Sequence, residues 1–336
     1  MSGNIKPEQA ASSLLFVSPA PHITGSNKTN RIMLDVIIAL CPSFIIAVWV
    51  FGTRAALITG VCVFSCVFFE WGFEKILKRK NTITDFSASL TGIILAYNLP
   101  VTIPVWQAVT GSFIAVILVK QIFGGLGKNF ANPAVTARVV MFLAFPITMT
   151  TWVEPYLLKS IFIPSGEMLD SITSATPLAH LLSMFRGGEY SLPTTWNLFL
   201  GVHGGCIGET SELALLIGFV YLLIRRVITP VIPLTFIGTV FLLTLAAGGL
   251  DFSVYHLLTG GLFIGAIFCA TDYVTSPQTE LGRAVFGIGC GVVTVVIRLF
   301  GSYPEGVSFA ILFMNMLVPY INKISYKKAL GGRYKK

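Results

Sequence analysis

The chain has 336 residues, of which 54% are hydrophobic and only 11% are charged. A soluble domain carries about 25% charged residues, so this chain cannot cover a water-facing surface, and its solvent must be lipid. The net charge of +8 would suggest nucleic acid for a soluble protein. Here the basic residues gather between apolar segments and at the C-terminus, as the positive-inside rule describes. We therefore expect an all-α polytopic membrane protein that contacts lipid and binds no nucleic acid.

The N-terminal thirty residues are polar, with no apolar stretch followed by a small-residue cleavage site. The first apolar helix is therefore expected to act as its own insertion signal. A spanning helix needs about 20 largely apolar residues, and shorter segments can be tilted, broken or re-entrant. Ten segments are candidates: about 32–51, 55–70, 84–99, 104–120, 133–149, 208–224, 228–248, 252–271, 283–300 and 306–322.

Lysine and arginine gather in alternate loops, which share one side if all ten segments cross the membrane. Basic loops stay in the cytoplasm, so both termini are predicted to be cytoplasmic. The predicted divisions are a cytoplasmic arm at 1–30, a first five-helix half at 31–150, an extracytoplasmic loop at 151–197, a second five-helix half at 198–322 and a basic tail at 323–336.

Two halves with five crossings each must have opposite orientations, as in inverted-repeat transporters. A short repeat agrees with this arrangement: Leu90-Thr91-Gly92 in the third segment recurs as Leu258-Thr259-Gly260 in the eighth. The sequence therefore predicts two inverted five-helix repeats.

All six cysteines lie in or beside apolar stretches, and no CxxC pair or Cys/His cluster has metal-ligand spacing. Cys62 and Cys66 are four residues apart and can share a helix face. We expect packing residues, with a metal or iron–sulfur site shared with another subunit as the alternative. No residue of this chain is predicted to be catalytic or to bind a metal.

The long loop contains a hydroxyl-rich stretch, Asp170-Ser-Ile-Thr-Ser-Ala-Thr-Pro177. Thr176 is suited to cap a short helix that starts at Pro177. A helix N-terminus presents free backbone N–H groups and the positive end of the dipole, which suit phosphate. The alternative is an ordinary capped surface helix.

A second polar stretch, Gly124-Gly-Leu-Gly-Lys-Asn-Phe-Ala-Asn-Pro-Ala134, separates the fourth and fifth segments. Its glycines allow the backbone to approach a ligand closely. The side-chain amides of Asn129 and Asn132 could form hydrogen bonds with the polar edge of a ring. It is no Walker loop, because no Gly-Lys-Ser/Thr ends it. The alternative is a tight turn between helices, with Pro133 starting the next helix.

Carboxylates mark two further stretches. Glu209, in Gly208-Glu-Thr-Ser211, lies near the outer end of the sixth segment, where it could complement a helix dipole or act functionally. Thr271 and Asp272 open a polar run at the inner end of the eighth segment, where Asp272 could pair with Arg283 or contact a cation or cofactor. Asp35, near Arg31, is expected to pair or to reach water.

Together these stretches resemble one known family. Asp170-x-x-Thr-Ser-Ala-Thr176 is similar to its flavinylation signal, with Ser174 where glycine is common. The Gly-Gly-Leu-Gly-x-Asn…Asn-Pro-Ala, Gly-Glu-Thr-Ser, Thr-Asp-x-Val-Thr-Ser-Pro and Tyr303-Pro-Glu-Gly306 runs are similar to its other motifs. The family contains the D subunit of the Rnf ion-translocating ferredoxin:NAD oxidoreductase and the B subunit of the sodium-translocating NADH:quinone reductase. The arm of about thirty residues favours the Rnf branch.

The resemblance implies a subunit of a redox-driven Na⁺ or H⁺ pump in the bacterial cytoplasmic (inner) membrane. It implies FMN joined to Thr176 by a phosphodiester bond and a second, non-covalent riboflavin. The implied partners are a flavin-bearing G subunit, an NAD-reducing C subunit, an iron–sulfur B subunit and the membrane A and E subunits. The residues expected to bind cofactor are Asp170, Thr173, Ser174 and Thr176 in the loop, and Gly124, Gly125, Asn129, Asn132, Glu209, Thr271 and Asp272 elsewhere.

Three alternatives stay open from the sequence. The chain could be the quinone-reductase B subunit, a flavin-free solute channel or transporter, or a structural subunit without cofactor. A plain transporter has no need for the hydroxyl-rich run from Asp170 to Thr176, so the redox interpretation is favoured.

Overall fold

A computed structural model describes residues 29–79, 81–152, 178, 181, 194–201, 203–209, 211–301 and 305–329. Within these ranges the chain is helical, and its one β feature is an isolated bridge between Pro100 and Cys206. Five helices in the described part are long and apolar enough to cross a membrane: α2 (Thr29–Phe51), α3 (Thr53–Ile76), α11 (Val231–Leu257), α13 (Glu280–Phe300) and α14 (Val307–Ala329).

Shorter helices complete the bundle. The apolar ones are α4 (Ser87–Tyr97), α5 (Val105–Phe113), which continues as the π-helix η2 (Ile114–Gln121), α6 (Pro133–Ala144), α10 (Glu212–Ile224) and α12 (Leu262–Ile264), which continues as the π-helix η5 (Gly265–Cys269). Single turns or short pieces are η1 (Ile83–Asp85), α7 (Pro146–Met149), α9 (Thr195–Leu200) and η4 (Ile207–Glu209). Each of the ten apolar segments predicted from the sequence contains helix.

The prediction of one continuous helix at 252–271 is wrong. Gly260 and Gly261 both have positive φ, 72° and 61°, a left-handed conformation that glycine adopts without the steric cost other residues meet. The chain therefore leaves α11 after Leu257 and starts again as α12. Another glycine with positive φ, Gly249 at 86°, bends α11 where the sequence predicted a loop between two segments.

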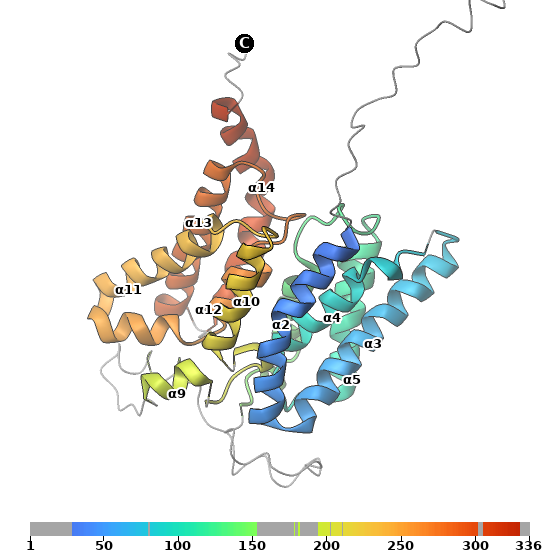
Figure 1. Ribbon diagram of the computed structural model, residues 1–336, viewed down its shortest axis with the longest axis horizontal. Coiled ribbons are helices and arrows are strands. Elements are labelled where there is room, and N and C mark those ends of the chain that lie inside the picture. The colour runs from blue at the N-terminus through green and yellow to red at the C-terminus, as the bar shows by residue number, and fades with distance from the viewer. Residues whose placement is uncertain are drawn as a thin grey trace, which may run out of the picture.

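The two sequence halves lie side by side, the first coloured blue to green and the second yellow to red (Figure 1). The first helix of one half, α2, packs along the first helix of the other, α10. The fifth helices, α6 and α14, also pack against each other. Corresponding helices therefore meet at the boundary between the halves. The extracytoplasmic loop predicted at 151–197 lies largely outside the described residues, so the domain limits stay predictions.

Small residues let the helices approach closely, as is usual in membrane bundles. A Cβ added to Gly218 of α10 would lie 2.3 Å from the carbonyl oxygen of Ala39 in α2. In the second half, Gly287 and Gly291 of α13 lie four residues apart and face Thr235 and Thr239 of α11. The contact between the halves therefore depends on the missing side chain at Gly218.

Gly218→Ala is expected to destabilise the protein by about 1–3 kcal/mol, because overpacking a tight contact forces the backbones apart. Gly238→Ala, in α11, is the matched control, since nothing lies within 4 Å of the added Cβ. Thermal unfolding of the detergent-purified protein should show a lower melting temperature for Gly218→Ala alone. Equal melting temperatures for the two variants would contradict this account of the α2–α10 contact.

The N-terminal end of α2 and the C-terminal end of α14 lie at the same end of the bundle (Figure 1). At α2, Asp35 pairs with Arg225, which follows α10, at 3.2 Å, and it accepts a hydrogen bond from Tyr221. Asp35 was expected to pair, and its partner is a residue of the other half. Arg79, after α3, donates to the carbonyl oxygen of Gln121 at 3.3 Å. We call this end of the bundle the basic end.

Candidate functional site

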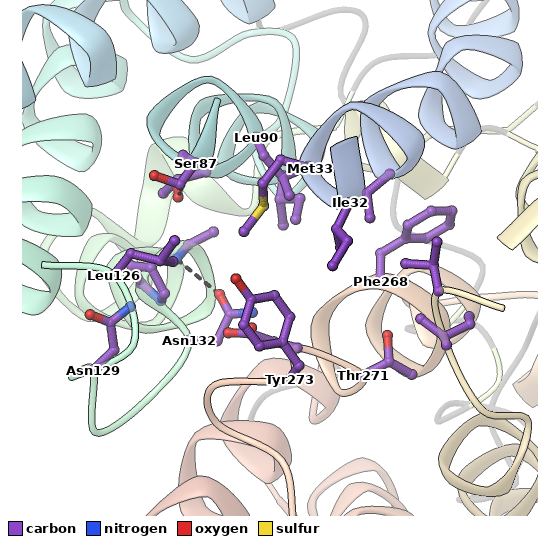
Figure 2. Close-up of a pocket in the computed structure, with 18 of the residues that line it drawn as sticks. Ile32, Met33, Ser87, Leu90, Leu126, Asn129, Asn132, Phe268, Thr271 and Tyr273 are labelled. Carbon is purple, nitrogen blue, oxygen red and sulfur yellow. Dashed lines mark hydrogen bonds between the residues drawn. The ribbon is translucent and has the colours of Figure 1, made fainter. Parts of the chain in front are cut away.

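The basic end holds a pocket with a cavity volume of about 90 Å³ that is partly open to solvent. Figure 2 shows that side chains from α2, α4, the 122–132 loop and the segment after η5 converge on it. Its walls are largely apolar, with Met33, Leu90 and Phe268 among them, and polar groups stand at its rim. Ligand pockets commonly have this composition, with a few polar groups fixing the ligand's orientation. We call it the inner pocket.

Four residues predicted to bind cofactor line the inner pocket: Asn129, Asn132, Thr271 and Asp272. They come from stretches more than one hundred residues apart in the sequence, and the fold brings them together. Gly124 and Gly125 are not among its lining residues. Both have positive φ, 112° and 92°, so they serve the turn that ends η2.

Asn132 has a structural role. Its Oδ1 accepts hydrogen bonds from the backbone N–H groups of Ala134 and Val135, which caps α6 as Pro133 starts that helix. Its Nδ2 donates to the carbonyl oxygen of Cys269 at 3.2 Å. These contacts use both ends of the amide and fix the start of α6, and the predicted contact of Asn132 with a ring edge stays a prediction. Asn129 differs, because its buried Oδ1 has no hydrogen-bond partner among the described residues.

Asp272 does not pair with Arg283. It accepts hydrogen bonds from the N–H of Val274 and the hydroxyl of Thr275, both at 3.2 Å. Arg283 instead donates to the carbonyl oxygen of Pro277 at 3.1 Å. Next to Asp272, burial and the neighbouring carboxylate raise the pKa of Tyr273 to about 12. The phenol of Tyr273 therefore keeps its proton at the mouth of the pocket and can donate a hydrogen bond.

Lys120, which lines the inner pocket, belongs to a buried ion pair. Lys120 of η2 lies 2.7 Å from Glu70 Oε1 of α3 and donates to Ser87 Oγ at 2.7 Å. Gln121 donates to the same carboxylate oxygen at 2.8 Å. Both charged side chains are at most 1% exposed. The pair therefore links α3 to η2 and leaves neither charge unpaired inside the bundle.

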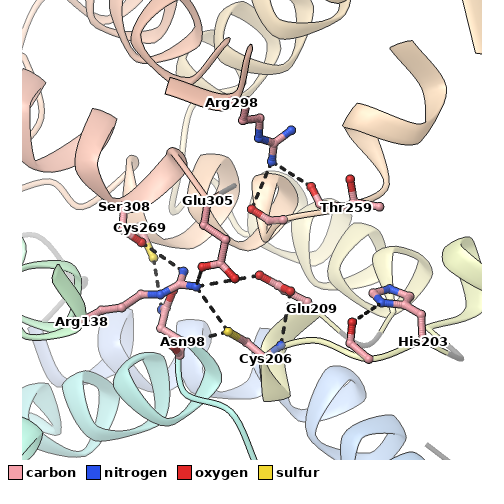
Figure 3. Close-up of polar contacts among 12 residues, drawn as sticks. Asn98, Arg138, His203, Cys206, Glu209, Thr259, Cys269, Arg298, Glu305 and Ser308 are labelled. Atoms are coloured by element: carbon pink, nitrogen blue, oxygen red, sulfur yellow. Dashed lines mark hydrogen bonds and ion pairs between the residues drawn. The ribbon is translucent and has the colours of Figure 1, made fainter. Parts of the chain in front are cut away.

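Glu209 lies elsewhere, in a second polar cluster that centres on Arg138 of α6 (Figure 3). Arg138 pairs with Glu305, donates to Asn98 Oδ1 at 3.0 Å and to Cys206 Sγ at 3.3 Å, and lies 4.0 Å from Glu209. These residues come from the break after α4, from α6, from the η4 segment and from the start of α14. We call Asn98, Arg138, Cys206, Glu209 and Glu305 the arginine cluster.

The position predicted for Glu209 needs correction. It ends η4, and α10 begins three residues later with Ser211 as its N-cap, whose hydroxyl accepts from the N–H of Ala214 at 3.3 Å. Glu209 is therefore not the dipole partner of α10. It is also not among the lining residues of the inner pocket, so the structure separates it from the other predicted cofactor residues.

Asp170, Thr173, Ser174 and Thr176 lie outside the described residues. Leu178 and Leu181, from the short helix predicted to begin at Pro177, are described, and both are helical and buried. Leu178 lines a small cavity together with Glu209 and Glu305. Leu178, the first described residue after the hydroxyl-rich stretch, therefore lies beside the arginine cluster.

The cysteines are free thiols, and all but Cys41 are buried. Cys62 and Cys66 lie on α3, and both are buried, as the packing interpretation predicts. Cys206 belongs to a three-residue group with metal-ligand geometry, but its companions are the carboxylates of Glu209 and Glu305. No described cysteine cluster has the composition of an iron–sulfur site.

Sequence reasoning missed several charged residues of these sites. They are Glu70, Lys120, Arg138 and Arg298, and Glu305 was noted only for its motif. A signal was present, because ionisable residues inside apolar segments are rare and commonly functional. Their partners could not be found that way, since each pair joins segments far apart in the chain.

The comparisons with known proteins agree with this architecture. Residues 16–331 match the model of the NQR2, RnfD, RnfE family. The chain is 42% identical to the D subunit of the Na⁺-translocating ferredoxin:NAD⁺ oxidoreductase complex of Acetobacterium woodii, over 94% of this chain and 95% of the relative. It is 40% identical to the D subunit of the proton-translocating ferredoxin:NAD⁺ oxidoreductase complex of Clostridium ljungdahlii, over 97% and 98% of the two chains.

A third relative is the D subunit of the ion-translocating oxidoreductase complex of Stutzerimonas stutzeri, 40% identical over 91% of this chain and 93% of the relative. The family model covers nearly the whole chain, and these relatives exceed 30% identity over almost their full length. The resemblance predicted from five short motifs is confirmed, and it favours a redox-linked subunit over a solute channel. The chain is a membrane protein that belongs to the NQR2, RnfD, RnfE family.

Proposed function

We propose that this chain is the flavin-carrying D subunit of an ion-translocating ferredoxin:NAD⁺ oxidoreductase. The printed names of the three relatives support this role. Relatives of almost equal identity move Na⁺ in one case and protons in the other, so the proposal includes both cations. The sister assignment, a quinone-reductase B subunit, is the weaker alternative, because these relatives are D subunits.

The observation that carries the flavin part is the run from Asp170 to Thr176. In this proposal the hydroxyl of Thr176 forms a phosphodiester with FMN, which keeps the ring tethered and leaves its redox chemistry intact. Asp170, Thr173 and Ser174 surround that attachment point in the sequence. Leu178 is buried at the cavity beside Glu209 and Glu305, which supports an ordered position for the chain close to the attachment point.

The inner pocket suits a second, non-covalent flavin such as riboflavin. Its apolar walls match the faces of a flat ring system, and the unpartnered Oδ1 of Asn129 could accept from a ring N–H. Tyr273 at the mouth offers a donor. Thr271 and Asp272 would contact the ring edge, while Asn132, Gly124 and Gly125 shape the loop that encloses it.

The proposed arrangement in the membrane has ten crossings, two inverted five-helix repeats and cytoplasmic termini. The basic end supports this orientation, since α2 begins there and α14 ends there (Figure 1). Electrons would enter from the flavin-bearing G subunit outside and leave toward the NAD-reducing C subunit inside. The iron–sulfur B subunit and the membrane A and E subunits complete the proposed complex in the bacterial cytoplasmic membrane.

A flavin inventory of the purified complex tests both cofactor sites. Acid precipitation releases non-covalent flavin to the supernatant and leaves a phosphodiester-linked flavin on the protein. The D subunit should keep one flavin in the pellet, and riboflavin should appear in the supernatant. A flavin-free pellet would contradict attachment to this chain.

Asn129→Leu should weaken riboflavin retention about 3- to 10-fold, because it removes one hydrogen bond to a buried polar group. The control is Asn197→Leu, at an exposed asparagine of α9 far from the pocket in sequence. Dialysis of each complex followed by fluorescence of the extracted flavin measures the retention. Equal retention in both variants would remove Asn129 from the riboflavin site.

A further inference from the structure

The arginine cluster contains two buried carboxylates that are only half satisfied. Glu209 and Glu305 are 5% and 7% exposed. Glu209 Oε1 and Glu305 Oε1 accept no hydrogen bond from any described residue. Ligand atoms of Glu209, Glu305 and Cys206 lie within 4.8 Å of one another. A buried acceptor without a partner is costly, so these oxygens call for a bound group that the protein itself does not provide.

The two free oxygens belong to residues that line the same small internal cavity. Thr259, Gly260, His203, Gly204 and Leu178 complete its lining. The cavity stands where the second half interrupts its helices at Gly260, and Arg138 links it to the break after α4 through Asn98 (Figure 3). In membrane transporters, ions bind at such interruptions, because unwound backbone exposes carbonyl oxygens there.

The nearby cations leave both oxygens without a donor. Arg138 pairs with Glu305 and is the only cation within 4.0 Å of Glu209 among the described residues. A second buried guanidinium, Arg298, donates to the carbonyl oxygens of His256, Thr259 and Gly260 at 2.5, 2.8 and 3.1 Å. Those carbonyls lie at the C-terminal end of α11 and just beyond it, where the helix dipole is negative, so Arg298 offsets the dipole.

Arg138 alone contacts the two carboxylates, while Arg298 attracts both from a greater distance and gives its hydrogen bonds to carbonyl oxygens. The other titratable groups nearby are His203, Cys206, Cys269 and Glu212, and none of them donates to the two free carboxylate oxygens. A buried carboxylate oxygen without a partner is expensive. Carboxylate and carbonyl oxygens prefer hard cations, so the missing group is a small hard cation.

We propose that Glu209 and Glu305 together bind one hard monovalent cation, Na⁺ or hydronium, on the translocation path. This inference rests on the proposed ion-moving function and not on either flavin. Arg138 orients Glu305 by pairing with it. The interruption at Gly260 borders the site and Arg138 links it to the break after α4, so relative movement of the two halves would open it to either side.

The test uses the whole complex in liposomes, with Glu209→Gln as the main variant. If the complex uses Na⁺, the Na⁺ concentration for half-maximal ferredoxin:NAD⁺ activity should rise about 10- to 100-fold, and ²²Na⁺ uptake should fall with it. If it uses protons, the rate should not depend on Na⁺, and lumen acidification per NADH formed should fall about tenfold. Glu209→Asp keeps the negative charge on a shorter side chain. It should change the half-maximal Na⁺ concentration, or the lumen acidification per NADH, less than Glu209→Gln does.

Glu212→Gln is the matched control, because Glu212 is also 5% exposed and has an unpartnered Oε2, but it does not line the cavity. It should behave as wild type in both assays. In-gel flavin fluorescence of the D subunit confirms that each variant is assembled and loaded. Wild-type ion dependence and uptake in both Glu209 variants would overturn the site and leave the flavin function standing. Electron transfer without any ion uptake in the wild type would overturn the site together with the ion-moving function.

Discussion

Arg138→Leu is expected to keep the protein from accumulating in the membrane. The change leaves Glu305 without its partner and Glu209 without the nearest cation, while Asn98 and Cys206 lose a donor. Removing one member of a buried pair costs about 3–5 kcal/mol, because the other charge stays buried and uncompensated. That is a large share of the stability of a typical domain. Immunoblots of membranes, with expression of the partner subunits unchanged, measure the effect.

Arg225→Leu serves as the control for this prediction. Arg225 also pairs with a carboxylate, Asp35, but its side chain is 53% exposed. Exposed pairs contribute about 0–1 kcal/mol, so this variant should accumulate normally. The double variant Arg138→Leu with Glu305→Gln should recover part of the lost protein, since it removes one of the unpaired charges. Normal accumulation of Arg138→Leu alone would show that the arginine cluster is not needed for folding.

Thr176→Ala is expected to reduce ferredoxin-dependent NAD⁺ reduction to the level of membranes that lack the complex. Alanine has no hydroxyl to carry the flavin phosphate, so the electron path would lose a carrier that no neighbouring group replaces. Thr176→Ser keeps a hydroxyl at the same position and should retain part of the activity. Thr150→Ala, at an exposed threonine after α7, should retain all of it. Unchanged turnover in Thr176→Ala would contradict the proposed electron path.

Much of the fold could be predicted from composition and the spacing of apolar segments. Low charge predicted a membrane bundle, and each predicted apolar segment contains helix. The failure at Gly260 and Gly261 has a local cause. Both glycines sit inside an apolar run, and their positive φ values, which break the helix, leave no mark in hydropathy.

The candidate sites were predicted unevenly. Asn129 was predicted in one polar run and Thr271 and Asp272 in another, and the fold brings them to one pocket. The side chain of Asn132 also caps α6, a role that the motif alone does not distinguish from a ring contact. Arg138 was missed because its partners lie 40 or more residues away, and only the packing of α4, α6 and α14 brings them together.

The most direct test of the central claim is in-gel flavin fluorescence of the denatured protein, wild type beside Thr176→Ala, with a flavin transferase co-expressed. Denaturation removes any flavin that is not covalently attached, so only the linkage to this chain is observed. We expect a fluorescent wild-type band and a dark Thr176→Ala band at equal protein load. A dark wild-type band, or a fluorescent Thr176→Ala band, would contradict it.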